Sequence, residues 1–90
     1  MKEKYESLIK IALGDIPFEL VQEVSAYDFN FKYAIYIEGI KVGLFNPDML
    51  DTLSLFVGAD KAETEFITIV KDQSATELRN HRILKKKYEY

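Results

Sequence analysis

Few residues in this chain have the type and spacing that catalysis requires. Cysteine is absent and His81 is the only histidine, which excludes disulfides, thiolate zinc sites and cysteine nucleophiles. His81 belongs to no recognisable catalytic motif with a serine or a second histidine. The four glycines form neither the GxGxxG nor the GxxxxGKS/T pattern of a phosphate-binding loop. We therefore predict no catalytic residues, no metal site and no cofactor.

Acidic residues gather at two places where carboxylates could collect a divalent cation: Asp48 with Asp51, and Asp60 with Glu63 and Glu65. Neither group has the spacing of an EF-hand loop, which needs a series of oxygen donors, an internal glycine and a closing glutamate. We interpret these acids as solvated loop residues and as complements of a helix dipole. The sequence does not single out any two of the acids as a general acid/base pair and does not exclude one. A carboxylate-dependent enzyme is therefore the second alternative function.

Charge is distributed unevenly along the chain. Residues 1–73 hold seven lysines and 13 acids, a balance of −6, whereas residues 74–90 hold five cations and two acids, a balance of +3. The cations of this basic end are Arg79, Arg82, Lys85, Lys86 and Lys87. We predict that they contact a partner, which could offer phosphate, an acidic protein surface or the acidic body of a second copy. A solvated polar face is the other interpretation, and the acidic body argues against strong non-specific DNA binding.

A β-hairpin is predicted after residue 28. Apolar residues occupy every second position of its first strand: Phe29, Phe31, Tyr33, Ile35 and Ile37. A turn at Glu38–Gly39 places Ile37 opposite Ile40, Ile35 opposite Val42 and Tyr33 opposite Leu44. All six of these side chains then share one face, and the other face carries Tyr36 and Phe45.

Aromatic residues make up 13% of the chain. Exposed rings could stack on single-stranded nucleic acid, but the strand that ends at Gly39 lacks the order of the RRM aromatic motif and lies in the acidic body. We therefore assign most rings to the core. Tyr36 and Phe45 are the exceptions, because the hairpin register puts them on the face opposite the main stripe, and we predict that they contact a partner.

The remaining elements follow from periodicity and from helix-terminal residues. A helix whose apolar stripe runs from Tyr5 to Leu13 stops at Gly14. Residues 16–26 fit either a strand or a short helix, and we favour the strand. A second helix follows the hairpin, with Asn46 as N-cap, Pro47 in its first turn and Gly58 as its stop. Its apolar stripe consists of residues at helical spacing: Met49, Leu50, Leu53, Phe56 and Val57.

The last third of the chain is predicted as a connector, a strand and a helix. Residues 59–65 are polar, and residues 66–70 are rich in β-branched residues, as in an interior strand. Residues 74–77 have the spacing of a capping box, so a helix is expected to begin at Ala75. Residues 82–90 fit either its continuation or an extended segment.

These elements predict one domain over residues 1–90 with an α+β fold in the order α-β-β-β-α-β-α. Its small, largely antiparallel sheet is expected to be covered on one face by helices. The pattern leaves the order of the strands in the sheet open.

We predict a small non-enzymatic protein-binding or regulatory module, such as a stoichiometric inhibitor or accessory protein. The expected partner is another protein, with a second copy of the chain as one candidate, and a nucleic-acid-binding protein that uses the basic end is the alternative. No apolar run reaches the length of a membrane span and no signal-peptide pattern is present, so we expect a cytoplasmic protein without a membrane partner. Ten lysines against two arginines fit a bacterial or phage origin.

Overall fold

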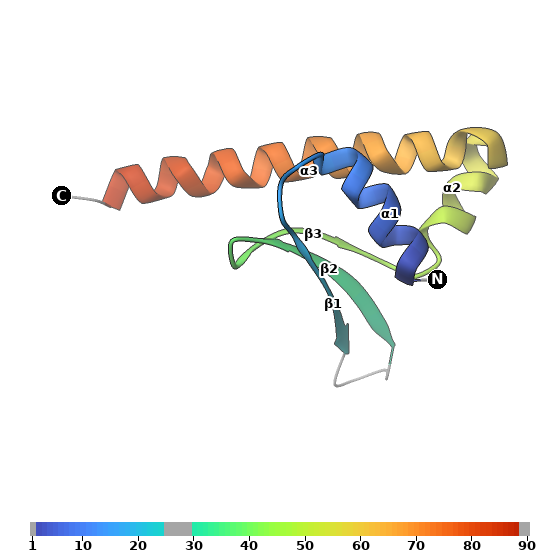
Figure 1. Ribbon diagram of the computed structural model, residues 1–90, viewed down its shortest axis with the longest axis horizontal. Helices are drawn as coiled ribbons and strands as arrows, with labels where there is room; N and C mark the ends of the chain where they lie inside the picture. The colour runs from blue at the N-terminus through green and yellow to red at the C-terminus, as the bar shows by residue number, and fades with distance from the viewer. Residues whose placement is uncertain (1, 25–29, 89–90) are drawn as a thin grey trace.

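The computed structural model describes the backbone of residues 2–24 and 30–88, and the side chains of these residues as far as Arg82. Three helices and three strands follow in the order α1 (Lys2–Leu13), β1 (Glu19–Val24), β2 (Phe31–Ile37), β3 (Ile40–Phe45), α2 (Met49–Val57) and α3 (Ala59–Tyr88) (Figure 1). The predicted α+β class is confirmed. The predicted element order is wrong at one place, because residues 66–70 are helical.

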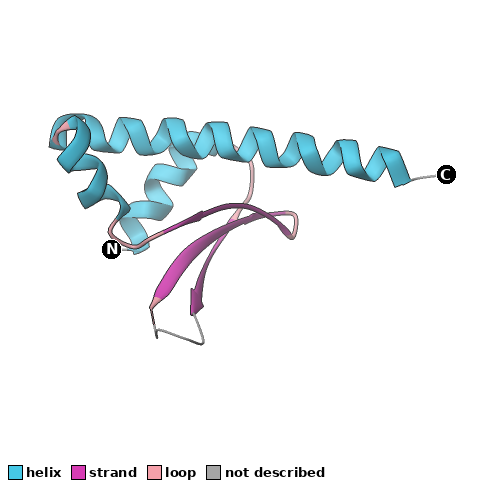
Figure 2. Cartoon of the chain, turned by 180° about the vertical axis from the view of Figure 1, so that it is seen from behind, coloured by secondary structure: helices cyan, strands magenta, loops and turns pink. Residues whose placement is uncertain are grey.

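The strands form one antiparallel sheet in the order β1-β2-β3. The helices lie on one side of this sheet, with α3 running the length of the molecule (Figures 1 and 2). We call the side toward the helices the inner face and the opposite side the outer face. The strand that we favoured within residues 16–26 is confirmed over Glu19–Val24, while the predicted hairpin position Phe29 lies outside the described residues.

A β-bulge corrects the predicted hairpin register. Ile37 pairs with Ile40 as expected, but Ile35 pairs with Gly43 and Tyr33 with Phe45, because Val42 is an extra residue in β3. The missing side chain of Gly43 makes room for Ile35, whose Cδ1 lies only 3.2 Å from where a Cβ would stand. The extra residue turns Phe45 into the core and Leu44 outward.

A single helix replaces the predicted connector, strand and final helix. The buried residues of α3 follow one another at intervals of four: Ala62, Phe66, Val70 and Ser74. This spacing keeps one side of a helix against the core. β-branched residues at 67–70 favour a strand locally, and residues four apart would share one face of a strand as well, so the spacing of the stripe does not by itself select the helix. Packing along the whole stripe therefore decides the conformation.

Glycines and a turn define the helix ends. Gly14 follows α1 with φ +65°, and its N–H donates to the Lys10 carbonyl as the predicted stop requires. Gly58 separates α2 from α3 with φ +88° and ψ 154°. The predicted start of the second helix is early by two residues, because Asn46 belongs to a turn in which its carbonyl accepts from the Met49 N–H. In the described part of the chain, no helix combines the length and the apolar character that a bilayer span needs.

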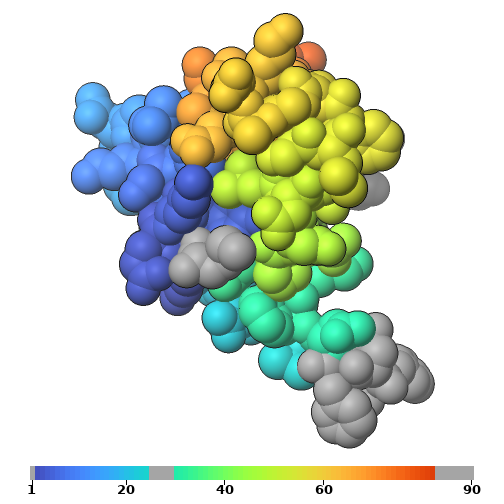
Figure 3. Space-filling model, turned by 90° about the vertical axis from the view of Figure 1, so that its right-hand side faces the viewer, coloured from blue at the N-terminus to red at the C-terminus, as the bar shows by residue number. Residues whose placement is uncertain are grey.

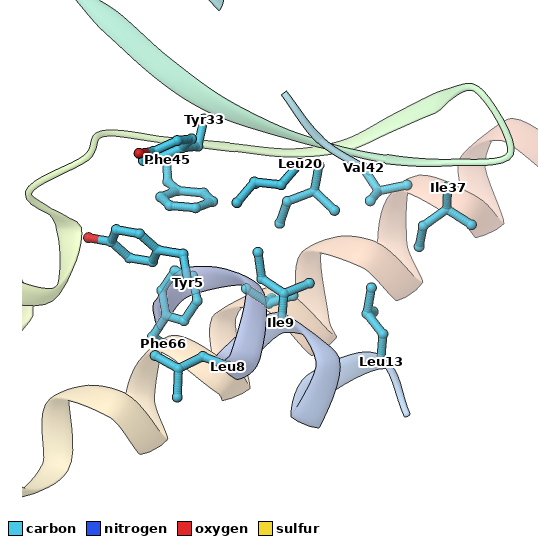
Figure 4. Packing of buried hydrophobic residues seen from close by; sticks show 12 residues of the cluster. Tyr5, Leu8, Ile9, Leu13, Leu20, Tyr33, Ile37, Val42, Phe45 and Phe66 are labelled. Atoms are coloured by element: carbon cyan, nitrogen blue, oxygen red, sulfur yellow. The ribbon is translucent and has the colours of Figure 1, made fainter. Parts of the chain in front are cut away.

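The core lies between the inner face and helices α1 and α3, with Tyr5 at its centre (Figure 4). The Tyr5 ring contacts three other rings, those of Tyr33, Phe45 and Phe66, at centroid distances of 5.6, 4.8 and 5.3 Å. Tilted contacts of this kind add to the free energy gained by burying the rings. The first helix, the hairpin and the last helix thus share one aromatic cluster.

Candidate protein-interaction surfaces

Helix α2 is fixed to the body at its N-terminal end. The Tyr5 hydroxyl donates to the Pro47 carbonyl at 2.6 Å and accepts from the Leu50 N–H at 3.1 Å. Burial raises the pKa of Tyr5 above its ordinary value of 10.0, although the bond from Leu50 acts in the opposite direction. The hydroxyl therefore stays protonated near neutral pH and can keep both bonds. Leu50 itself and Leu53 pack against the core.

The C-terminal end of α2 presents apolar side chains to solvent. Leu55 is 87% exposed, Phe56 81% and Val57 37%. We call these three consecutive residues the α2 patch. α2, in yellow-green to yellow, forms an outward surface of the molecule in Figure 3. Single exposed apolar residues are ordinary, whereas several exposed together mark a candidate interaction site.

The α2 patch was not predicted, because the spacing of Phe56 and Val57 assigned them to the apolar stripe of the second helix. A signal was present. Six of the nine residues of α2 are large and apolar, which is more than one face of a two-and-a-half-turn helix can bury. Some of them had to face solvent, although periodicity alone did not decide which.

The outer face carries a cluster of three polar side chains, one from each strand. The Tyr36 hydroxyl donates to Glu23 Oε1 at 2.6 Å, and Lys41 Nζ lies 2.9 Å from each Glu23 oxygen. Lys41 Nζ also lies 5.9 Å from the centre of the Tyr36 ring, within the range of a cation–π contact. Tyr36 is therefore on the outer face, as predicted.

The cluster also explains why Ala34 is fully buried although it lies on the outer face, which no helix covers. Tyr36 stands opposite Glu19, whereas Glu23 stands opposite Lys32, four positions further along β2. Their hydrogen bond can form only if the Tyr36 side chain extends along the sheet past Ala34, which is 0% exposed. The outer face is thus partly covered by its own side chains.

Glu23 is held in its charged form. The hydrogen bonds from Tyr36 and then Lys41 lower the pKa of Glu23 below its ordinary value of 4.5, and the same contacts raise the pKa of Tyr36 and of Lys41. A catalytic carboxylic acid needs a raised pKa to donate a proton near neutral pH, whereas the pKa of Glu23 is lowered. The cluster therefore has the electrostatics of a structural ion pair.

A groove runs beside the cluster, where the chain before β1 separates from the β2–β3 turn. It encloses about 690 Å³ and is lined mainly by apolar groups, among them Ile16, Pro17, Val21 and the Tyr36 ring. Its volume is in the range of small-molecule sites. The Glu19 and Glu38 side chains are the charged groups in its described lining.

The basic end lies on α3 beyond Leu78, the last described side chain that packs on the core. Arg79 and Arg82 are exposed, and their part of α3 extends past the sheet (Figure 1). The backbone of Lys85, Lys86 and Lys87 continues the helix, but their side chains lie outside the described part. The structure thus brings Arg79 and Arg82 together and places Tyr36 on the sheet, while Phe45 is corrected to a core residue.

Other residues singled out in the sequence do not converge. His81 is exposed on α3, and Asp60, Glu63 and Glu65 belong to the first turns of that helix. Among the residues that the structure describes, no three histidine, aspartate or glutamate side chains are grouped as metal ligands.

Comparison with known proteins adds no relative. The chain matches no protein-family model, no curated protein and no solved structure.

Proposed function

We propose that this protein is a non-enzymatic binding module that presents the α2 patch to another protein. The observation that carries the proposal is the exposure of Leu55 and Phe56, adjacent large apolar side chains that no described element covers. Covering them with a partner removes apolar surface from water.

The energetics favour this patch over the other surfaces. Fully burying a leucine or phenylalanine side chain stabilises a complex by about 1.5–3 kcal/mol, so two such residues can change an affinity by two or more orders of magnitude. Aromatic anchors often dominate interfaces. Because Tyr5 fixes the start of α2, the patch is ordered before binding, which lowers the entropy cost of association.

A binding module of this kind suits a regulatory role. A small protein that covers part of its partner can act as a stoichiometric inhibitor or as an accessory subunit without chemistry of its own. The absence of cysteine is compatible with folding in a reducing cytoplasm. The lysine-rich composition favours a bacterial or phage source.

The test is affinity capture from the native host with quantitative mass spectrometry, using the wild type, a Leu55→Ser/Phe56→Ser variant and an Ile11→Ser control. Ile11 is an apolar residue of α1 with 64% exposure, so the control removes exposed apolar surface elsewhere. We expect the wild type and the control to retain the same partner and the double variant to lose it, with equal melting temperatures. Equal retention by all three proteins would contradict the proposal.

Nucleic acid binding is a second candidate, because Arg79 and Arg82 are exposed on the end of α3 that extends past the sheet. Phosphate contacts would make binding salt-dependent. Fluorescence anisotropy with labelled single- and double-stranded DNA should show affinity that falls with salt and is lost in Arg79→Glu/Arg82→Glu. A matched Lys10→Glu/Lys61→Glu control changes the same charge on α1 and at the start of α3. Equal affinity of the two variants would exclude the basic end as the site.

A further inference from the structure

Strand β1 (Glu19–Val24) lies at an edge of the sheet and, among the residues that the structure describes, pairs with β2 alone. No other described strand pairs with the backbone N–H and C=O groups on its other side. Such an edge can pair with another extended chain, and proteins commonly protect edges with prolines, lysines, bulges or a covering element.

The two edges of this sheet differ in that protection. Strand β3 contains the bulge at Val42, and α3 runs close enough for Gln73 Oε1 to lie 3.5 Å from the Cβ position of Gly43. Strand β1 pairs in regular register over all six of its residues, and it contains neither proline nor lysine. Among the described residues, the β1 edge is therefore regular and lacks a bulge, a proline and a lysine, and its two charged residues, Glu19 and Glu23, lie on the outer face.

Side chains at the end of β1 are also left uncovered on the inner face. Leu20, Gln22 and Val24 alternate on this face, in register with Ile35, Tyr33 and Phe31. Leu20 is buried under the helices, but Gln22 is exposed and Val24 is 69% exposed. In Figure 1 this end of the sheet points away from the helices.

From these observations we propose that a second copy of this chain pairs its β1 strand antiparallel with this edge, around a two-fold axis at Gln22. The two sheets then form one continuous six-stranded sheet. A two-fold axis perpendicular to the sheet makes the interface self-complementary. It also requires that inner-face residues stand opposite inner-face residues, since paired residues in a ladder share a face.

Only two registers satisfy this rule and pair five residues within β1. A register centred on Val21 would oppose Glu19 and Glu23 of the two copies twice, which places like charges opposite one another. The register centred on Gln22 opposes Leu20 with Val24 of the second copy, and Val21 with its Glu23. We therefore choose the Gln22 register.

This register accounts for the side chains on the inner face. Each exposed Val24 would be covered by Leu20 of the second copy. The two Gln22 side chains would meet at the axis, where their amides can donate to and accept from each other. A five-residue ladder is a smaller contact than a stable interface, which buries roughly 800 Å² per partner. We therefore expect a weak dimer that forms at high protein concentration.

The absence of cysteine from the chain allows a direct test. In the proposed dimer, Gln22→Cys places two thiols opposite each other, at a Cα separation of about 4.5–5.5 Å that a disulfide can bridge. Glu19→Cys is the matched control, because it is exposed on the same strand but far from its own copy across the axis. Under mild oxidation we expect Gln22→Cys to form a covalent dimer at least tenfold faster than Glu19→Cys. Equal rates, or no dimer from Gln22→Cys, would overturn the pairing.

Sedimentation velocity over a concentration series tests the same contact without cross-linking. The wild type and Ile11→Lys, a control on α1, should show the same concentration-dependent dimer, and Val24→Lys should remain monomeric. A wild type that stays monomeric up to millimolar concentration would overturn the proposal, and so would a Val24→Lys dimer as stable as that of the wild type. Neither result depends on the α2 patch, since that surface belongs to another element.

Discussion

Tyr5 joins three parts of the fold through one side chain. Its ring packs among the rings of the hairpin and α3, and its hydroxyl bonds the backbone at the start of α2. The hydroxyl thus satisfies a carbonyl and an N–H that helix α2 itself leaves unpaired. A phenylalanine would keep the packing and lose both bonds.

We predict that Tyr5→Phe lowers the free energy of unfolding by about 1–3 kcal/mol, because Pro47 and Leu50 lose their buried partner. Urea denaturation followed by circular dichroism measures this change. Tyr33→Phe is the control, since the Tyr33 hydroxyl has no hydrogen bond with the described residues, and it should lower stability less. If the two variants are equally stable, the Tyr5 bonds do not hold α2.

Glu23 gives the fold a dependence on acid pH. Its pKa in the folded protein lies below the ordinary value of 4.5 because Tyr36 and Lys41 bond the carboxylate. The stabilisation by ionised Glu23 is therefore complete above pH 4.5 and disappears as the pH falls through the folded pKa.

We predict that the wild type loses more stability than Glu23→Gln when the pH is lowered from about 5 to about 3. Tyr36→Phe removes the larger of the two contacts but keeps Lys41, so its loss should be intermediate. Urea unfolding at a series of pH values gives the comparison. Parallel curves for all three proteins would show that the cluster does not shift Glu23.

At the scale of elements, Gly58 separates α2 from α3. Its backbone at φ +88° and ψ 154° lies in a region that is essentially restricted to glycine. We predict that Gly58→Ala lowers the free energy of unfolding by about 1–3 kcal/mol, measured by urea denaturation. Ala75→Gly, at an exposed position inside α3, is a control for helix propensity and should cost at most about 1 kcal/mol. An unchanged Gly58→Ala protein would show that the break does not depend on this conformation.

The sequence predicted elements well where local signals and packing agree. α1 ends at Gly14 and α2 at Gly58 as expected, and β2 meets β3 at Glu38–Gly39. α3 was not predicted as one helix, because its β-branched segment has strand propensity and the four-residue spacing of its buried positions also fits one face of a strand.

The predicted site residues divide for a similar reason. Tyr36 pairs with Lys41, between the turn and the bulge at Val42, and therefore lies on the predicted face. Phe45 lies beyond the bulge and therefore points to the opposite face from the one predicted. One inserted residue inverts a two-residue period, and alternation alone does not locate a bulge. The α2 patch depends on which face α3 and α1 leave uncovered, a tertiary property that a nine-residue helix does not encode by itself.

For the molecule as a whole, the helices and the sheet share one apolar cluster. This arrangement predicts a single cooperative unfolding transition. Phe66→Ala should lower the free energy of unfolding by about 3–5 kcal/mol, with far-ultraviolet circular dichroism and tyrosine near-ultraviolet signals still changing together. Ile11→Ala should change it by less than about 0.5 kcal/mol, since Ile11 is exposed. Separate transitions for the two signals would show that the helices and the sheet fold independently.

The position of Tyr5 also determines how late in synthesis the core can form. Tyr5 is made early, yet one of its ring partners, Phe66, belongs to α3 and is made much later. While the ribosome is still adding α2, the apolar side chains of α1 and the hairpin have no final helix to pack against. The nascent chain must therefore keep these surfaces from premature association until α3 emerges, and the fold closes only at that late stage.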